Sequence, residues 1–499
     1  MGQKKQSASD PNNETKKRRR VGFSAADAGV EAKECIKIFL VSSKEEFCAP
    51  ESFVIEPVDL NSFFDDDGKI YGYEDLKITI WVSSISFHAY AEIEFQSSSD
   101  RGKGITDLKS ALQRIFAETL VESKDEFLQS FLADKDFVRT TISNGEILKH
   151  KAFNGHISDS NSHSEAATFN SEVVRMVVGK MATGHLYSRL IPLVLLLVDG
   201  SSPIDVTDPR WELYLLIQKK SDQQGEIQCR LIGFTAVYRF FHYPDGSRLR
   251  LSQILILPPY QHKGHGRYLL EVLSDVAISE NVFDLTVEEP LDHFQHVRTC
   301  VDTLRLLHFD PIQHAVSSAV SLLKQGKLSK KAHSPRLTPP PSAIEDVRKS
   351  LKINKKQFLQ CWEVLIYLGL DPVEKHMEDF SSIISNRVKY DILGKDSGTS
   401  GKQLIEVPSE YDEEMSFFMF RSEANDEAST VQVDENQKNQ EEQLQKLVQE
   451  RVDEIKLIAE KIQIYSQILT TRTLIIQSVF VGLIALKGST LPAAIDCSL

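Results

Sequence analysis

The sequence predicts an α/β (α+β) protein: a mixed sheet with flanking helices, preceded by a small α/β domain and followed by a helical C-terminal region. Up to about residue 312, segments with the apolar pattern of strands are interleaved with helical segments. Beyond that point only a helical spacing of apolar residues recurs. The chain has 499 residues, 41% hydrophobic and 26% charged, which is enough for roughly two to four domains with buried cores.

The composition indicates which cellular compartment and which kind of partner to expect. The six cysteines are scattered without a C-x-x-C pair, and no signal peptide precedes them, which predicts a reducing compartment with free thiols. The formal net charge of −13 favours a basic partner over nucleic acid or an anionic membrane. The exception is the run of five cations from Lys16 to Arg20, in a polar start that we expect to be a disordered basic tail over 1–34. Such a run is typical of a nuclear import signal, and nucleic-acid contact is the weaker alternative.

Residues 35–155 are predicted to form the small N-terminal α/β domain. Strand patterns cover 35–41, 76–82 and 88–95, and two helices follow near 105–119 and 124–134. The glycine- and serine-rich segment "NGHISDSNSHSE" at 154–165 indicates a loop or a boundary.

The next predicted domain, 156–312, begins with a buried helix over Leu186–Val198 that is too short to span a bilayer. Three strands at 211–218, 229–241 and 248–257 follow with short polar turns, which predicts a meander. The segment "LILPPYQHKGHGRYLLEVL" then passes from strand through a turn into a helix that ends near Ile278. A strand over 282–289 and a helix over 291–308 complete the domain.

The turn in that segment has the spacing Gln261-x-x-Gly264-x-Gly266. Without a Cβ, backbone N–H groups can approach an anion closely, and the following helix points its positive dipole end at the same place. A Rossmann turn would need a third glycine where Leu269 stands, and in a P-loop the lysine would follow its glycine, whereas Lys263 precedes Gly264. The spacing alone predicts a pyrophosphate cradle, with a purely structural pair of glycines as the alternative.

The order of meander, strand, Gln-x-x-Gly-x-Gly turn, helix and strand resembles the acetyl-CoA-binding core of the GNAT acetyltransferases. Four segments resemble the catalytic subunit of the type B histone acetyltransferases more closely: "IDVTDPRW" (204–211), "GFTAVYRFFHYPD" (233–245), "SQILILPPYQHKGHGRYLLE" (252–271) and "LTVEEP" (285–290). The likeness extends to "DDDGKIYGYEDLKI" (65–78) and "LKINKKQFLQCWEVL" (351–365).

This resemblance implies a histone acetyltransferase with acetyl-CoA as cosubstrate, no metal, and a place for the cofactor along the third strand of the meander. The backbone of Ile254, Leu255 and Ile256 is expected to pair with the pantetheine arm. The pyrophosphate is expected on the turn, at Gln261, His262, Lys263, Gly264, His265, Gly266 and Arg267. The spacing His262-x-x-His265 occurs in metal pairs, but no third acidic or cysteine ligand is near it in sequence, so a metal is not expected there. A metal is likewise not expected at His293-x-x-His296.

The resemblance also places the family's catalytic glutamate on Glu288. A lysine ammonium must lose a proton before it attacks a thioester, and a desolvated carboxylate is able to accept that proton. Strand alternation would turn the neighbouring Glu289 to the other side, and Asp199 matches a second family acid that is normally glutamate. Both are possible auxiliary groups.

The implied substrate is the lysine-rich N-terminal tail of a free, newly synthesised core histone of the H4 class, acetylated before chromatin assembly. Electrostatics and aromatic contacts to lysine stems agree with such a peptide. Arg239 departs from the neutral residue expected there, and His293 and Phe294 replace the usual serine and tyrosine. The expected substrate residues are Asp66, Asp67, Trp211, Tyr238, Arg239 and Phe240, with further acids at Asp65, Asp205 and Asp208.

The remaining chain is predicted to be a helical domain over 313–395, with one helix capped by Ser342. A flexible acidic linker over 396–438 leads to 439–499, which comprises a helix and an unassigned apolar tail. The helix is either exposed, part of a coiled coil, or docked on its own domain.

Two other function classes stay open: a GNAT enzyme for another basic peptide or a small amine, and an inactive acetyl-CoA-binding scaffold for histone chaperones. The family further implies a WD-repeat histone-binding subunit as partner, no direct nucleic-acid or membrane contact, and a location in nucleus and cytoplasm.

Overall fold

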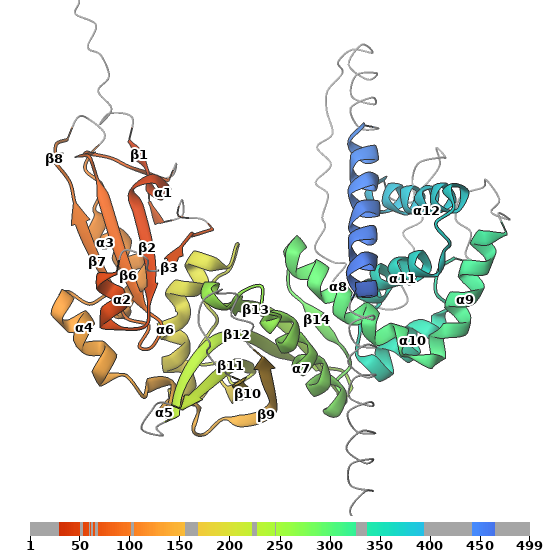
Figure 1. Cartoon of the computed structure of the whole chain (residues 1–499), viewed down its shortest axis with the longest axis horizontal. Helices are drawn as coiled ribbons and strands as arrows, with labels where there is room; N and C mark the ends of the chain where they lie inside the picture. Colours follow the sequence, from red (N-terminus) through yellow and green to blue (C-terminus); the bar gives the residue numbers. More distant parts are fainter. Residues whose placement is uncertain are drawn as a thin grey trace, which may run out of the picture. The chain divides into compact units, whose positions relative to one another are not determined.

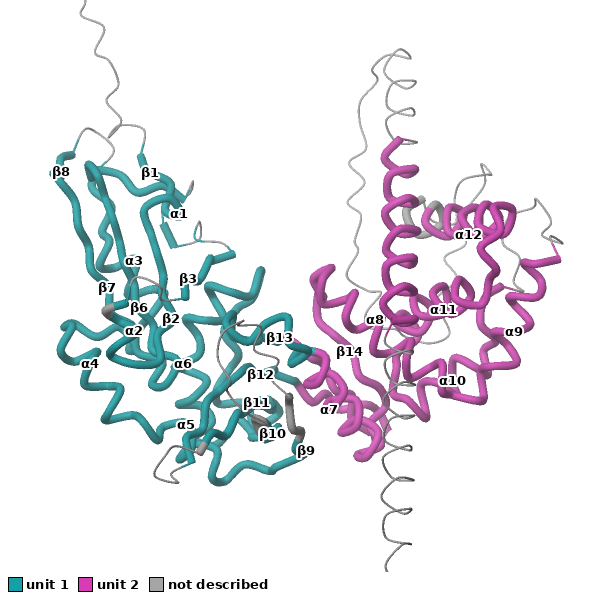
Figure 2. The backbone as a smooth tube through the Cα atoms, in the orientation of Figure 1, with its two compact units in different colours: residues 1–237, 253–266 teal, residues 238–252, 267–499 magenta. Residues whose placement is uncertain are grey.

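The computed structural model describes residues 29–49, 53–58, 60, 63–64, 68–100, 104–154, 168–221, 227–244, 246–325, 337–393 and 442–464. Residues 1–28 of the predicted basic tail, Asp65 to Asp67, the 396–438 linker and the apolar tail after residue 464 lie outside these residues. The last residues of the predicted tail are described, and they form the strand Val30–Glu31 and the start of the helix Ala32–Cys35. Backbone contacts divide the chain into two compact units, residues 1–237 with 253–266 and residues 238–252 with 267–499 (Figure 2). The predicted domain boundaries remain predictions from composition.

The first unit begins with a four-stranded mixed sheet in the order β3-β2-β6-β7 (Figure 1). In it β2 (Ile36–Val41) runs parallel to β6 (Lys77–Ser83), while β3 (Phe53–Ile55) and β7 (Ala89–Glu94) are antiparallel to their neighbours. Alternate residues of β2 and β6 are buried, as one core-facing side of a sheet requires. Two short ladders accompany it, β1 (Val30–Glu31) with β4 (Lys69–Ile70) and β5 (Tyr73–Glu74) with β8 (Ser97–Ser98).

Several helices of this unit begin where a polar side chain accepts a hydrogen bond from a free backbone N–H group. Asp107 caps α3 (Leu108–Phe116), which continues into η3 (Ala117–Thr119), and Ser123 caps α4 (Lys124–Ala133). These helices match the predicted ones within a few residues. Three short helices complete the N-terminal part: α1 (Ala32–Cys35), α2 (Lys44–Cys48) and α5 (Phe137–Ile142).

The larger sheet has six strands in the order β14-β13-β12-β11-β10-β9. The predicted meander corresponds to β11 (Trp211–Ser221), β12 (Ile227–His242) and β13 (Gly246–Ile256). The sequence prediction missed β9 (Glu146–Asn154) and β10 (Thr168–Val177), which pair with each other in antiparallel register on either side of the predicted 154–165 loop. That segment therefore connects two strands of one sheet.

Beneath these strands lies α6 (Met181–Leu197), the predicted buried helix, which begins five residues earlier than expected. Leu186, Tyr187, Leu190 and Leu193 on this helix are buried in one core with Leu213 of β11 and Leu255 of β13. Among the described residues, no helix is long and apolar enough to cross a membrane.

The second unit is mainly helical. After η4 (Pro258–Tyr260), α7 (His265–Ser279) leads to the short β14 (Leu285–Val287) and then to α8 (Asp292–Leu307), α9 (Asp310–Lys324), α10 (Pro341–Leu351), α11 (Lys355–Gly369) and α12 (Glu374–Leu393). The predicted cap of α10 by Ser342 is wrong. Pro340 stands at the cap position and Pro341 opens the helix, where a missing N–H costs nothing, so Ser342 lies inside the first turn.

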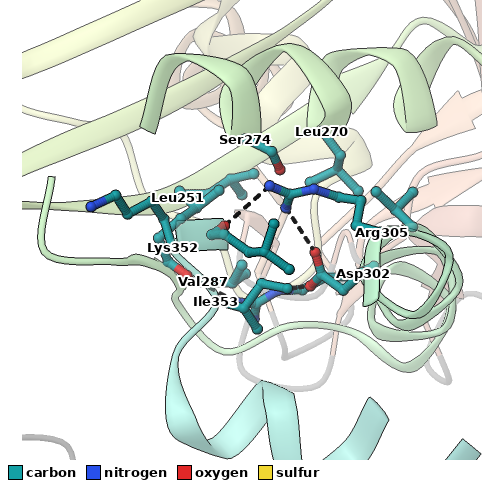
Figure 3. A pocket seen from close by; sticks show the side chains of 12 residues that line it. Leu251, Leu270, Ser274, Val287, Asp302, Arg305, Lys352 and Ile353 are labelled. Carbon is teal, nitrogen blue, oxygen red and sulfur yellow. Dashed lines mark hydrogen bonds and ion pairs between the residues drawn. The ribbon is translucent and has the colours of Figure 1, made fainter. Parts of the chain in front are cut away.

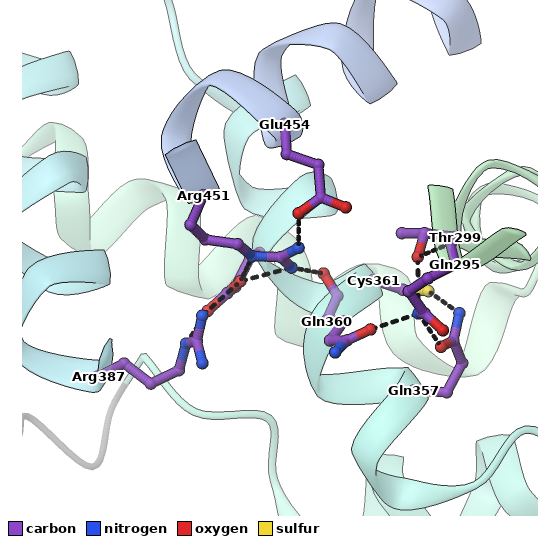
Figure 4. Close-up of polar contacts among 9 residues, drawn as sticks. Gln295, Thr299, Gln357, Gln360, Cys361, Arg387, Arg451 and Glu454 are labelled. Carbon is purple, nitrogen blue, oxygen red and sulfur yellow. Dashed lines mark hydrogen bonds and ion pairs between the residues drawn. The ribbon is translucent and has the colours of Figure 1, made fainter. Parts of the chain in front are cut away.

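The helix over residues 442–464 is docked on this unit, which settles the alternatives left open for it. Its buried residues Val452, Ile455, Ile458 and Ile462 share a core with Phe358 and Trp362 of α11. Figure 4 shows the polar part of the contact: Arg451 reaches Glu363 at 2.9 Å, and Arg387 binds the same carboxylate. Arg451 also pairs with Glu454 at 2.6 Å.

Candidate active site

The turn between β13 and α7 has the backbone that its sequence predicts. Leu257 closes the strand by donating its N–H to the Ile232 carbonyl at 2.9 Å, and η4 then turns the chain. Gly264 has φ +80°, a left-handed conformation that glycine adopts without steric cost. His262 has φ +59°, so two of the four exposed turn residues are left-handed. The chain thereby reverses into α7, whose first N–H groups have no acceptor within the helix itself.

At Gly266 the fold itself has room for a side chain. A Cβ there would lie 3.7 Å from Cγ1 of Ile256, an ordinary van der Waals contact, and φ is not in the left-handed region. The fold therefore does not require glycine at this position, in contrast to Gly264. A ligand that approaches the backbone closely is a physical reason for glycine there.

The side chains of the turn are engaged with their own chain. Gln261 donates its amide to the carbonyl of Ile256 at 2.9 Å, and Lys263 donates Nζ to that of Pro259 at 3.0 Å. Arg267 is paired with Glu271 at 2.7 Å. Anion binding by this turn would consequently depend on backbone N–H groups more than on free cations. The Ile256 carbonyl, one of the groups expected to face the cofactor, already has a donor.

Sequence reasoning missed a second glycine that shapes this strand. A Cβ on Gly233 of β12 would lie 2.6 Å from the Leu255 carbonyl oxygen and 2.6 Å from Cδ1 of Ile256. Atoms do not approach a Cβ this closely, so only glycine lets β12 lie against the end of β13 at this point. The signal was a glycine inside the strand pattern "LIGFTAV", which commonly marks close backbone approach.

The predicted acids lie at the end of β14, which is shorter than expected. Its parallel register pairs Leu249 with Leu285 and Leu251 with Val287 of β14. The N–H of Glu288 still donates to the Leu251 carbonyl at 2.9 Å, and its carboxylate accepts a 2.5 Å hydrogen bond from the Ser252 hydroxyl. Both Glu288 and the next residue are exposed.

The strand alternation that was expected to separate the two acids does not extend to Glu289. The strand ends at Val287, and Glu289 has φ +36°, outside the extended region. Its orientation follows from this irregular backbone, not from a strand period of two. Nothing places Asp199 beside them: it is exposed in the turn after α6, in the first unit.

The aromatic residues expected to bind substrate lie together on β12. The rings of Tyr238 and Phe240 meet edge to face with centroids 4.5 Å apart, and the Arg250 guanidinium lies 4.5 Å from the Phe240 centroid. Arg239 points away from this pair, since alternate residues face opposite sides. It binds Glu280 at 2.8 Å. The carboxylate of Glu280 thereby compensates the positive charge of Arg239.

Other expected substrate residues belong to the first unit. Trp211 is half-buried and packs against the core at the start of β11. Asp205 accepts hydrogen bonds from the N–H and the hydroxyl of Thr207, which lower its pKa, and Asp208 forms a 2.8 Å ion pair with Arg210. The negative charge of Asp208 is thus partly neutralised within its own loop.

A small hollow in the second unit lies on the other side of β13 and β14. Leu251 and Val287 line it, and Figure 3 shows Arg305 beside them, bound to Asp302 at 3.4 Å and to the Leu351 carbonyl at 3.1 Å. Burial raises the pKa of Asp302, and the neighbouring arginines oppose that shift. Leu251 and Val287 alternate with Ser252 and Glu288 along the strands. The hollow therefore lies on the opposite face of the sheet from the Ser252–Glu288 contact.

None of the described histidines, cysteines and acids form a group of three that is able to hold a metal ion. His296 of the second predicted pair instead lies 2.8 Å from Nζ of Lys461.

Comparisons with known proteins identify the family of this chain. Two family models match: "Histone acetyl transferase HAT1 N-terminus" over residues 28–199 and "Acetyltransferase (GNAT) family" over residues 203–296. A histone acetyltransferase type B catalytic subunit of Arabidopsis thaliana is 59% identical over 463 residues, covering 93% of this chain and 98% of the relative. The chain belongs to the type B histone acetyltransferase catalytic subunits.

Two further members of this family show how far the likeness extends. The subunit of the same description from Zea mays is 48% identical over 90% of this chain and 94% of its own length. That of Mycosarcoma maydis is 28% identical over 61% of this chain and 68% of its own length. The acetyltransferase described here thus has a GNAT domain over residues 203–296, and the N-terminal region of its family precedes it over residues 28–199.

Proposed function

We propose that this acetyltransferase transfers acetyl from acetyl-CoA to lysine ε-amines on the N-terminal tail of free, newly synthesised histone H4, before chromatin assembly. Glu288 acts as the general base in a direct attack of the amine on the thioester. The observation that carries the proposal is that two hydrogen bonds fix Glu288. Its N–H donates to the Leu251 carbonyl, and its carboxylate accepts from the Ser252 hydroxyl. A carboxylate fixed at a strand end is suited to accept a proton at one place.

Acetyl-CoA supplies the acetyl group as a thioester, and the turn after β13 fits its pyrophosphate. Gly264 makes the left-handed turn possible, and Gly266 leaves the first turn of α7 open to a ligand. Backbone groups of Ile254, Leu255 and Ile256 are proposed to pair with the pantetheine arm, and the Gln261 amide already donates to the Ile256 carbonyl.

The reaction needs a base because a lysine ammonium has a pKa near about 10.4 and is almost fully protonated at neutral pH. Glu288 accepts a proton from the ammonium, directly or through a water, and the neutral amine nitrogen bonds to the acyl carbon as the carbon–sulfur bond breaks. Of the two protons that the nitrogen loses, one goes to the departing thiolate of coenzyme A and the other to solvent. General-base catalysis of this kind contributes roughly 10²–10⁴ in rate. Glu289 and Asp199 remain possible auxiliary groups.

Tyr238 and Phe240 are proposed to contact the apolar stems of substrate lysines, as aromatic rings on one strand face are able to do. Trp211, Asp66 and Asp67 complete the proposed binding residues. A WD-repeat histone-binding subunit is the proposed protein partner. Import by the Lys16 to Arg20 run would give a nuclear as well as a cytoplasmic location.

The test is to incubate the purified full chain with acetyl-CoA and three acceptors in parallel: free core histones, nucleosomes of the same histones, and a polyamine. Mass spectrometry then maps the acetylated positions. Acetylation of free H4 tail lysines in preference to the other acceptors is expected. Preferential polyamine acetylation would support the small-amine alternative, and acetyl-CoA binding without turnover on any acceptor would support the inactive scaffold.

A further inference from the structure

Glu288 is the first residue after β14, so the sheet holds its backbone N–H but does not fix the torsions of its side chain. β14 ends at Val287, and Glu289, the residue after Glu288, leaves the extended region with φ +36°. The Leu251 carbonyl fixes the backbone N–H of Glu288, but that contact leaves three side-chain torsions undetermined. An exposed glutamate in this situation would populate several rotamers.

Ser252 supplies the missing restraint. Along β13 and β14, Leu251 and Val287 are paired and line the hollow on one side of the sheet. Ser252 and Glu288 each follow one of these residues, so both side chains face the other side. Their proximity is therefore a consequence of the parallel register, and the Ser252 hydroxyl lies 2.5 Å from Oε2 of Glu288.

We propose that Ser252 is a positioning residue for the reaction: its hydroxyl holds the Glu288 carboxylate in one rotamer and leaves Oε1 to receive the proton. The inference rests on the proposed role of Glu288 as general base. A hydroxyl has one hydrogen, and donating it to an ionised carboxylate gives a strong bond that occupies one oxygen only. The acceptor for the substrate proton is then at a fixed distance from β13, the strand proposed to bind the cofactor.

The alternative is that the contact is an ordinary surface hydrogen bond without effect on the reaction. Both interpretations predict a folded Ser252→Ala protein, so stability does not separate them. They differ in turnover, and in whether the effect of Ser252 depends on the presence of the Glu288 carboxylate.

The experiment compares steady-state kinetics of full-length Ser252→Ala, Ser252→Thr, Glu288→Gln and the Ser252→Ala/Glu288→Gln double variant on free histones. Ser279→Ala is the matched control, since it removes a hydroxyl that donates to the Val276 carbonyl at the end of α7. We expect Ser252→Ala to lower kcat by about 10- to 100-fold with little change in KM for either substrate, because misplacing a catalytic group costs up to about 10²-fold. Ser252→Thr, which keeps the hydroxyl, should restore most of kcat.

In the Glu288→Gln background, Ser252→Ala should cause no further loss. Wild-type kcat in Ser252→Ala, or an equal loss with and without the Glu288 carboxylate, overturns the positioning role while leaving Glu288 as base. If instead Glu288→Gln itself retains wild-type activity, the proposed base is wrong and the inference falls with it.

Discussion

The hydroxyl of Tyr187 donates a hydrogen bond to Oε1 of Gln253 across 2.9 Å, and both side chains are buried. The same hydroxyl accepts the N–H of Ile204 at 3.1 Å. Gln253 in turn donates its amide to the Ser201 hydroxyl at 2.9 Å and to the Ser202 carbonyl at 2.7 Å. Two adjacent residues of β13 thus contact different parts of the chain. Gln253 binds the segment after α6, and Ser252 binds Glu288.

Replacing Tyr187 by phenylalanine should destabilise the protein by about 2–4 kcal/mol, because two buried groups, Oε1 of Gln253 and the N–H of Ile204, each lose their partner. Urea denaturation measures the loss. Tyr243→Phe is the control, since Tyr243 is 84% exposed and its change should stay within about 0.5 kcal/mol. Equal stability of the two variants would show that the Tyr187 hydroxyl contributes nothing.

Glu288→Gln should lower turnover by roughly 10²–10⁴ at neutral pH while acetyl-CoA affinity stays near normal, because the amide cannot accept a proton. The deficit should shrink as the pH rises, since more of the substrate lysine is then neutral. The measurement is kcat against pH, together with calorimetry of acetyl-CoA binding.

Glu289→Gln is the matched control for that experiment. It should cost much less, because the contacts from Leu251 and Ser252 hold Glu288 and not its neighbour. If the two variants lose activity equally, Glu288 and Glu289 have to be treated as a coupled unit.

Gly266→Ala should reduce acetyl-CoA affinity at least about tenfold, or ~1.4 kcal/mol, without loss of stability. The new Cβ would make only an ordinary 3.7 Å contact with Ile256 inside the protein, whereas it would keep the pyrophosphate from the backbone. Gly264→Ala is the contrasting variant. Its φ of +80° makes alanine cost roughly 1–2 kcal/mol in stability as well. Calorimetry that finds wild-type affinity in folded Gly266→Ala would remove the cradle assignment.

His296 should make the docking of the 442–464 helix sensitive to acid. Burial lowers its pKa, the nearby Lys461 lowers it further, and Glu454 opposes this. Since the folded-state pKa lies below the usual 6.5, the neutral ring stabilises the fold above that pH, and this stability is lost as the pH falls below it. Wild-type thermal stability should therefore decline more between about pH 7 and 5 than that of His296→Gln, in which nothing titrates at this position. Parallel pH profiles of the two proteins would contradict the prediction.

The local features of this enzyme could be predicted from the sequence because neighbours along the chain determine them. The apolar patterns located β11, β12, β13 and α6, and the Asp107 and Ser123 caps stand at the starts of two predicted helices. The sequence also predicted a turn that leads from β13 into a helix, and the structure has this turn, with Gly264 in a left-handed conformation. Where a local signal had a competitor, as with Ser342 beside Pro341, the prediction was wrong.

The family, too, followed from the sequence alone, since the segments from Ile204 to Pro290 could be matched without coordinates. What the tertiary structure decided is which distant side chains meet. Ser252 and Glu288 are 36 residues apart, and Tyr187 and Gln253 are 66 apart. Contacts over such separations depend on strand register, because a shift by one residue would turn Ser252 to the opposite face of the sheet and Gln253 out of the core. No pattern along a single strand contains that register, so the restraint on the proposed base becomes visible only when β13 and β14 are paired.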